Sequence, residues 1–328
     1  MQKGKHILDS IYKSIGNTPM VRLQKVPKMH GIECEVLVKC EFMNPGGSVK
    51  DRMALEMIEE AERTGRIQKG DTLVEATSGN AGIGFAFLTA CKGYNMVVTL
   101  PQRMSNEKVS VLKSLGCEVV RTPSKAPTFS EESYYMVARK LVKEGGEGWH
   151  ILDQYGNPSN QSAHYKTTGQ EIYDQCDGEL DYLFAGTGTG GTITGVSKKL
   201  KELNPKIKAI AIDPYGSALA YPETLNKTDV KGFTVEGIGK DFIPDSIDRD
   251  FVDGWVKTYD GEAYGVAREL IKQEGLLCGG SCGSAVFGAF KYLKDNNLHK
   301  NKNLRIVVIL PDSIRNYLTK FCCDDWMV

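Results

Sequence analysis

Short apolar runs alternate along the chain with segments whose apolar residues recur once per helical turn. The runs at residues 72–75 and 304–310 are rich in Val, Leu and Ile, and their lengths are typical of buried strands. Met53, Met57 and Ala61 lie four residues apart, which places them on one face of a helix. Alternating strands and helices predict parallel sheets that helices cover on both faces.

The same pattern gives the order of the elements. We expect strands at residues 36–38, 72–75, 95–100, 117–120, 150–152, 182–185, 207–212 and 304–310. We expect helices from about Ser48 past Ala61, from about Asn80 to Ala90, and over residues 105–115, 131–142, 192–203, 262–274 and 285–293, with a glycine turn at 279–284 and an irregular stretch at 215–250. A chain of 328 residues suggests about two domains. The sequence therefore predicts an α/β fold with two parallel sheets and a cleft between them.

Composition and charge exclude several classes of protein. The 41 Lys and Arg residues balance the 41 Asp and Glu residues, so no basic surface indicates a nucleic-acid partner. No apolar run approaches the roughly 20 residues of a membrane-spanning helix, and the first residues lack the apolar core of a signal peptide. The nine cysteines are odd in number and show neither a Cys-x-x-Cys pair nor zinc-finger spacing. We therefore expect a cytoplasmic enzyme with free thiols, no metal site and no membrane contact.

Glycine is concentrated in four short segments. The chain has 35 glycines, and the excess over the average content of about 7% falls at 46–47, 79–84, 186–195 and 279–283. Residues 186–192 lie between an expected strand and an expected helix, where backbone N–H groups bind phosphate. This segment also matches the dinucleotide pattern Gly-x-Gly-x-x-Gly, with Asp213 about twenty residues further on. On this motif alone, a nicotinamide cofactor is an open alternative.

Lys50 lies in an unusual place for a lysine, in the first turn of an expected helix after the glycine pair at 46–47. The positive end of the helix dipole disfavours a charged amine, so it favours the neutral form that can bond to an aldehyde. A solvated surface cation is the ordinary alternative for a single lysine. Together with a phosphate loop and no histidine beside a nucleophile motif, Lys50 points to pyridoxal phosphate, which carries an aldehyde and a phosphate on one ring.

Four motifs resemble, in order, those of the fold-type II pyridoxal-phosphate enzymes of the cysteine synthase and cystathionine β-synthase group. They are NPGGSVKDR at 44–52, TSGNAGIG at 77–84, GTGGT at 188–192 and GGSCGS at 279–284. The resemblance extends from SIGNTP at 14–19 to the C-terminus, and PDSIRNY at 311–317 is more similar to the catalytic core of cystathionine β-synthases than to cysteine synthases. It implies a smaller mobile domain at 41–154, and a larger domain that anchors the cofactor at 1–40 and 155–328.

The resemblance also assigns roles to single residues. Lys50 would hold the cofactor covalently and move the Cα proton of the substrate. The other cofactor contacts would be Asn80 at the ring hydroxyl, Ser281 at the pyridine nitrogen, and Gly188, Thr189, Gly190, Gly191 and Thr192 at the phosphate. The substrate carboxylate would be bound by Thr77, Ser78 and Gln154, with Ala81 beside them. Because a hydroxyl at the pyridine nitrogen gives a mild electron sink, we expect β-replacement rather than transamination.

Some features depart from the family pattern. Ala81 stands where threonine is usual, which removes a hydroxyl from the expected carboxylate site. Lys240 stands where cystathionine β-synthases have tyrosine, and it either recruits an anionic second substrate or is simply solvated. No cysteine precedes Asn17, so we expect no haem, and because the sequence ends at Val328 we expect no regulatory tandem domain like that of some relatives.

The activity that the resemblance implies is the condensation of L-serine with L-homocysteine to L-cystathionine and water, by a homodimer. Cysteine synthase, which joins sulfide to O-acetylserine or serine, is the first alternative. Because Ala81 lacks the family's hydroxyl, a weakly catalytic or non-catalytic sensor on the same scaffold is the second.

Overall fold

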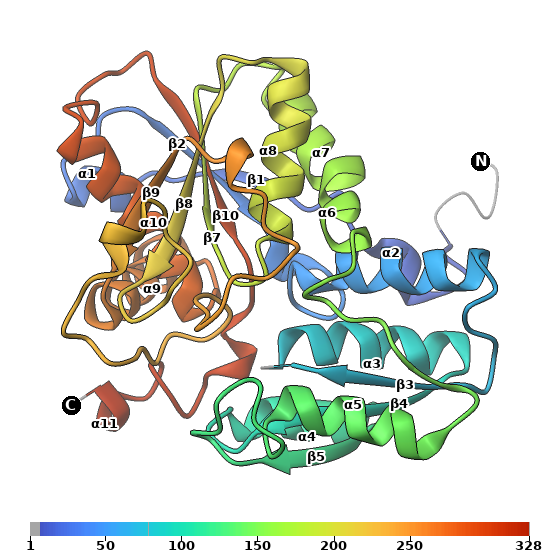
Figure 1. Ribbon diagram of the computed structural model, residues 1–328. Helices are drawn as coiled ribbons and strands as arrows, with labels where there is room; N and C mark the ends of the chain where they lie inside the picture. The colour runs from blue at the N-terminus through green and yellow to red at the C-terminus, as the bar shows by residue number, and fades with distance from the viewer. Residues whose placement is uncertain (1–6, 78, 328) are drawn as a thin grey trace.

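The computed structural model describes residues 7–77 and 79–327, which form two sheets covered by helices (Figure 1). The larger sheet has six strands in the order β1-β2-β10-β7-β8-β9. Neighbouring strands are parallel, except that β1 pairs antiparallel with β2. The strands are β1 (Met20–Arg22), β2 (Glu35–Cys40), β7 (Tyr182–Gly186), β8 (Lys208–Pro214), β9 (Gly254–Thr258) and β10 (Arg305–Leu310).

The smaller sheet has four parallel strands in the order β5-β4-β3-β6. It is built from one continuous stretch of chain and lies beside the larger sheet (Figure 1). Its strands are β3 (Thr72–Ala76), β4 (Asn95–Pro101), β5 (Glu118–Thr122) and β6 (Trp149–Ile151). Two mainly parallel sheets with covering helices confirm the predicted α/β fold.

Helices cover both faces of each sheet. On the larger sheet, α1, α9 and α10 pack on one face, and α7 and α8 on the other; α2, α3 and α5 cover the smaller sheet. The helices are α1 (Val26–Met29), α2 (Lys50–Arg63), α3 (Asn80–Lys92), α4 (Asn106–Ser114), α5 (Tyr134–Gly145), α6 (Ser159–Ala163), α7 (Gly169–Gln175), α8 (Gly191–Leu203), α9 (Asp260–Glu274), α10 (Gly280–Asp295) and α11 (Asp324–Met327). Within the described residues, no helix has the length and apolar character needed to cross a membrane.

The central strands are apolar because both of their faces are buried. In β10, Ile306 and Val308 pack toward α9 and α10, whereas Val307 between them packs toward α7 and α8. In the smaller sheet, Leu73 packs with α2 and α3, and its neighbour Val74 packs with α5. Successive side chains of a strand point to opposite faces, so these strands need apolar residues at consecutive positions.

The glycine segment at 279–284 differs from the prediction of a turn, because α10 already begins at Gly280. A Cβ atom on Gly283 would lie 1.9 Å from the carbonyl oxygen of Ala263. The missing side chain therefore lets the first turn of α10 pack directly against α9. Helix α5 also begins later than predicted, where the Ser133 hydroxyl accepts a hydrogen bond from the Met136 amide at 3.1 Å and caps the helix.

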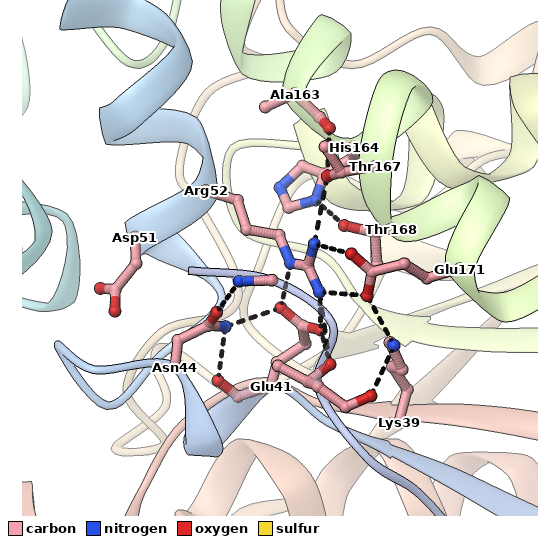
Figure 2. A network of polar contacts seen from close by, with 12 residues as sticks. Lys39, Glu41, Asn44, Asp51, Arg52, Ala163, His164, Thr167, Thr168 and Glu171 are labelled. Atoms are coloured by element: carbon pink, nitrogen blue, oxygen red, sulfur yellow. Dashed lines mark hydrogen bonds and ion pairs between the residues drawn. The ribbon is translucent and has the colours of Figure 1, made fainter. Parts of the chain in front are cut away.

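A buried network of charges joins the start of α2 to the larger sheet (Figure 2). Arg52 lies between two carboxylates: its Nε donates to Glu41 Oε2 at 2.7 Å, and its Nη1 donates to Glu171 Oε1 at 2.7 Å. Lys39 of β2 donates to Glu171 Oε2, also at 2.7 Å. Burial alone would raise the pKa of Glu171, but its hydrogen bonds to Arg52 and the charges of Arg52 and Lys39 lower it to about 2. The network therefore holds ionised groups in a fixed arrangement two residues from Lys50.

Candidate active site

A cavity of about 870 Å³ lies between the two sheets. Loops that follow β3 and β7 reach it, which is where the carboxyl ends of parallel strands place ligand sites. The cavity is lined by most of the residues that the sequence assigns to a site: Lys50, Thr77, Asn80, Ala81, Gln154, Gly188, Thr189, Gly190, Thr192 and Ser281. Gly191 is not among the lining residues, and a Cβ there would lie 2.1 Å from Asn160 Oδ1. Ser78 lies outside the described residues.

Lys50 is the first residue of α2 and reaches into the cavity. The chain just before it is held by the segment that follows β10, because the Val49 amide donates to the carbonyl oxygen of Pro311 at 2.8 Å. The Lys50 amine lies 3.4 Å from the hydroxyl oxygen of Thr189. Burial, and secondly the charge of Lys240, lower the pKa of Lys50 to about 8. A substantial fraction of this amine is therefore neutral near physiological pH, the form that reacts with an aldehyde.

The glycine loop between β7 and α8 is tightly packed against two neighbouring segments of the chain. Gly190 has a φ of +88°, and a Cβ there would lie 2.3 Å from the Cβ of Ile247. A Cβ on Gly188 would lie 2.6 Å from the carbonyl oxygen of Gly237. The loop therefore needs glycine at both positions to bring its backbone N–H groups to the start of α8, a helix of 13 residues whose dipole favours an anion.

On the far wall of the cavity, one buried carboxylate joins two of the predicted cofactor contacts. Asp312 accepts hydrogen bonds from Asn80 Nδ2 at 2.7 Å and from Ser281 Oγ at 3.3 Å, and the Tyr317 hydroxyl also donates to it. A Cβ on Gly237 would lie 3.7 Å from Ser281 Oγ and 3.9 Å from Asn80 Nδ2. Both polar groups therefore face a gap that stays open because Gly237 has no side chain.

The predicted carboxylate site is buried and partly satisfied by the protein itself. The Thr77 hydroxyl oxygen accepts a hydrogen bond from the Gly79 amide at 3.0 Å, and Gln154 Nε2 donates to the carbonyl oxygen of Ala76 at 2.9 Å. Ala81 is 2% exposed and adds no polar atom. These contacts fix the two side chains beside the first turn of α3, and Gln154 Nε2 keeps a second hydrogen for a ligand.

Asp213, the acidic residue that would support a nicotinamide cofactor, has another partner. Its carboxylate forms a buried ion pair with Lys257, with Nζ 2.7 Å from Oδ2, and it does not line the cavity. Asp213 therefore gives no support to the dinucleotide interpretation of the glycine loop.

Several residues of this region were not assigned to the site from the sequence. Asp312 belongs to a recognised motif, but the sequence alone does not show that its carboxylate reaches both Asn80 and Ser281. The cavity is also lined by Tyr134 and Tyr155, to which the sequence assigns no role. Their hydroxyl oxygens lie 3.2 Å apart. Only the packing of α5 beside the chain after β6 brings them together.

Comparison with known proteins identifies the family. Residues 11–312 match the family model described as pyridoxal-phosphate dependent enzyme. The chain is 55% identical over its whole length to cystathionine beta-synthase of Oryctolagus cuniculus, and it spans 59% of that relative. It is also 54% identical, over 99% of its length, to cystathionine beta-synthase of Dictyostelium discoideum, and it spans 64% of that second relative. A solved structure of a hydrogen sulfide-producing enzyme from Fusobacterium nucleatum is 36% identical, with a TM-score of 0.86 over 95% of this chain and 100% of that one. The chain therefore belongs to the fold-type II family of pyridoxal-phosphate dependent enzymes.

Proposed function

We propose that this protein condenses L-serine with L-homocysteine to L-cystathionine and water by β-replacement. The observation that carries the proposal is the Lys50 amine, with its lowered pKa, facing a cavity that ends at the glycine loop and the start of α8. The identity of more than half to cystathionine beta-synthases along the whole chain supports this choice of substrates.

The donor set of the cavity suits pyridoxal phosphate. Lys50 would bond to the aldehyde, and the loop from Gly188 to Thr192 would bind the phosphate. Asn80 and Ser281 would contact the ring from the gap beside Gly237, where Asp312 holds both side chains in place. Bound pyridoxal phosphate supplies an electron sink that makes the Cα proton of an amino acid acidic.

The side chains of the protein then bind the substrate carboxylate and transfer the protons. Thr77, Ser78 and Gln154 hold the serine carboxylate, so that the Cα proton faces the Lys50 amine. Lys50 Nζ takes this proton and delivers a proton to the hydroxyl that leaves Cβ as water. The sulfur of homocysteine bonds to Cβ, and its proton returns through Lys50 to Cα. One water is released for each cystathionine formed.

The proposal is tested with the cofactor-loaded protein and two pairs of substrates. We expect cystathionine from L-serine and L-homocysteine, measured by mass spectrometry. The second pair is O-acetylserine with sulfide, and formation of cysteine from it without any cystathionine from the first pair would contradict the proposal. That outcome would identify the cysteine synthase alternative.

Replacing Ala81 by threonine tests the carboxylate site. We expect the KM for L-serine to fall by about 2–10-fold, because one additional neutral hydrogen bond is worth about 0.5–1.5 kcal/mol. The matched control is Ala81→Val, which has nearly the same shape as threonine but no hydroxyl. Steady-state kinetics of both variants measure the effect. An equal rise in the KM of both variants would show that a larger side chain at position 81 obstructs serine, whether or not it carries a hydroxyl. No turnover by the wild type or by either variant would favour the sensor alternative.

We also propose a domain division, an assembly and a compartment. Residues 41–154 would move as a smaller domain against 1–40 and 155–328, since the smaller sheet falls within the first range. The protein would be a homodimer, as the family resemblance implies, and exposed Ile7, Leu8 and Ile11 offer apolar surface for a contact. The cytoplasm would suit its nine free cysteines, several of them buried.

A further inference from the structure

Lys240 is a cation in the cavity with neutral hydrogen-bond partners. Its Nζ lies 3.0 Å from the Tyr155 hydroxyl and 3.4 Å from the Tyr134 hydroxyl, and 4.8 Å from the centre of the Tyr155 ring. The adjacent carboxylate of Asp241 is engaged elsewhere, because it accepts the Thr128 hydroxyl at 2.9 Å. Within residues 7–77 and 79–327, no carboxylate forms an ion pair with Lys240.

Three buried lysines outside the cavity do have such partners. Each of them lies within 2.7 Å of a carboxylate oxygen: Lys39 with Glu171, Lys108 with Glu236, and Lys257 with Asp213. Pairing is expected, because a cation removed from water is costly without an anion beside it. Lys240, half-buried in the cavity wall, therefore has an unused capacity to bind an anion.

The backbone fixes Lys240 at this place. Its amide donates to the Ser217 hydroxyl oxygen at 3.0 Å, and its carbonyl oxygen accepts the Ala218 amide at 2.8 Å. The two tyrosine hydroxyls hold the amine at the other end of the side chain. The charge is close enough to Lys50 to contribute to the low pKa of that amine. An anion bound at Lys240 would thus lie in the same cavity as the Lys50 amine.

We propose that Lys240 binds the carboxylate of the thiol substrate and selects thiols that carry one. The proposal rests on the β-replacement proposed above, in which a thiol must place its sulfur at the Cβ of serine beside Lys50. A thiol with a carboxylate at its other end can bond through that group to the Lys240 amine while its sulfur points toward Lys50. A charge-assisted hydrogen bond of this kind is stronger than a neutral one.

Two thiols that lack an amino group test the contact with Lys240 without competing for the site of serine. Mercaptobutanoate carries a carboxylate, whereas mercaptobutanol has a hydroxyl in its place, and neither can occupy the covalent site through an amine. With serine in excess, we expect Lys240→Met to raise the KM for mercaptobutanoate by about tenfold or more and to leave that for mercaptobutanol within about twofold. Lys240→Arg should restore most of the preference. Lys231→Met is the matched control, since Lys231 also lines the cavity but is exposed.

A binding measurement tests the carboxylate site at Lys240 independently of the proposed reaction. Calorimetry with methylthiobutanoate, which has the carboxylate but no reactive thiol, should show a Kd that rises about tenfold in Lys240→Met and not in Lys231→Met. If this holds while wild type forms no product from serine and any thiol, the carboxylate site stands and the proposed reaction fails. If wild type forms product but neither KM nor Kd depends on Lys240, the carboxylate site is wrong. Melting curves establish that each variant is folded.

Discussion

Lys50→Ala is expected to reduce cystathionine formation by about 10³-fold or more. The variant loses the amine that would take and return protons, and positioned proton transfer alone contributes about 10²–10⁴-fold to enzymatic rates. It also loses the covalent hold on the cofactor. We therefore expect the purified variant to lack the visible absorption of lysine-bound pyridoxal phosphate, even after the cofactor is added.

The control for this variant is Lys69→Ala, which removes a lysine exposed on the surface. It should keep both the absorption and the turnover of the wild type. The melting temperature of Lys50→Ala without cofactor should stay near that of the wild type without cofactor, because the Lys50 amine makes one long contact to Thr189, at 3.4 Å. Substantial turnover by the alanine variant would contradict the role given to Lys50.

Arg52→Met is expected to destabilise the folded protein by about 3–5 kcal/mol, because removing one member of a buried ion pair leaves an uncompensated charge. Glu41 has no solvent-exposed surface, and it would lose the guanidinium that binds both of its oxygens. Glu171 would keep Lys39 but lose two of its hydrogen bonds. Urea unfolding of the cofactor-free protein, monitored by circular dichroism, measures the change.

The matched control lies on the same helix. Arg63 also pairs with a carboxylate, that of Glu60, but both side chains are exposed. Surface pairs of this kind contribute little, so Arg63→Met should shift the urea midpoint far less than Arg52→Met. Equal shifts for the two variants would show that the buried network does not stabilise the fold as proposed.

The sequence predicts most of this fold because local patterns and burial agree. The stacking of Met53, Met57 and Ala61 predicts α2, and all three are buried in the core beneath it. The run that becomes β10 is apolar at consecutive positions because two layers of helices cover it. By contrast, β1 is three residues long, and α6 is rich in polar residues, so neither has a periodic signal of its own.

The active site, too, is predicted only where its residues stand in a local sequence motif. Lys50, Asn80 and Ser281 stand in motifs that are visible along the chain, and the structure brings them to one cavity. The link between Asn80 and Asp312 joins residues 232 positions apart, and a spacing of that kind has no signal in a single sequence. The neutral hydrogen-bond partners of Lys240 depend likewise on which side chains face it in the folded protein.

The place of β10 in the larger sheet has a consequence for how the protein is made. Among the strands of residues 7–77 and 79–327, β10 comes last along the chain, yet it lies between β2 and β7. The smaller sheet is complete once its continuous stretch of chain has left the ribosome, so it can fold while the larger sheet still lacks its middle strand. The carbonyl of Pro311, which holds the residue before Lys50, emerges later still. The contact that holds the residue before Lys50 can therefore form only after the chain has been synthesised as far as Pro311.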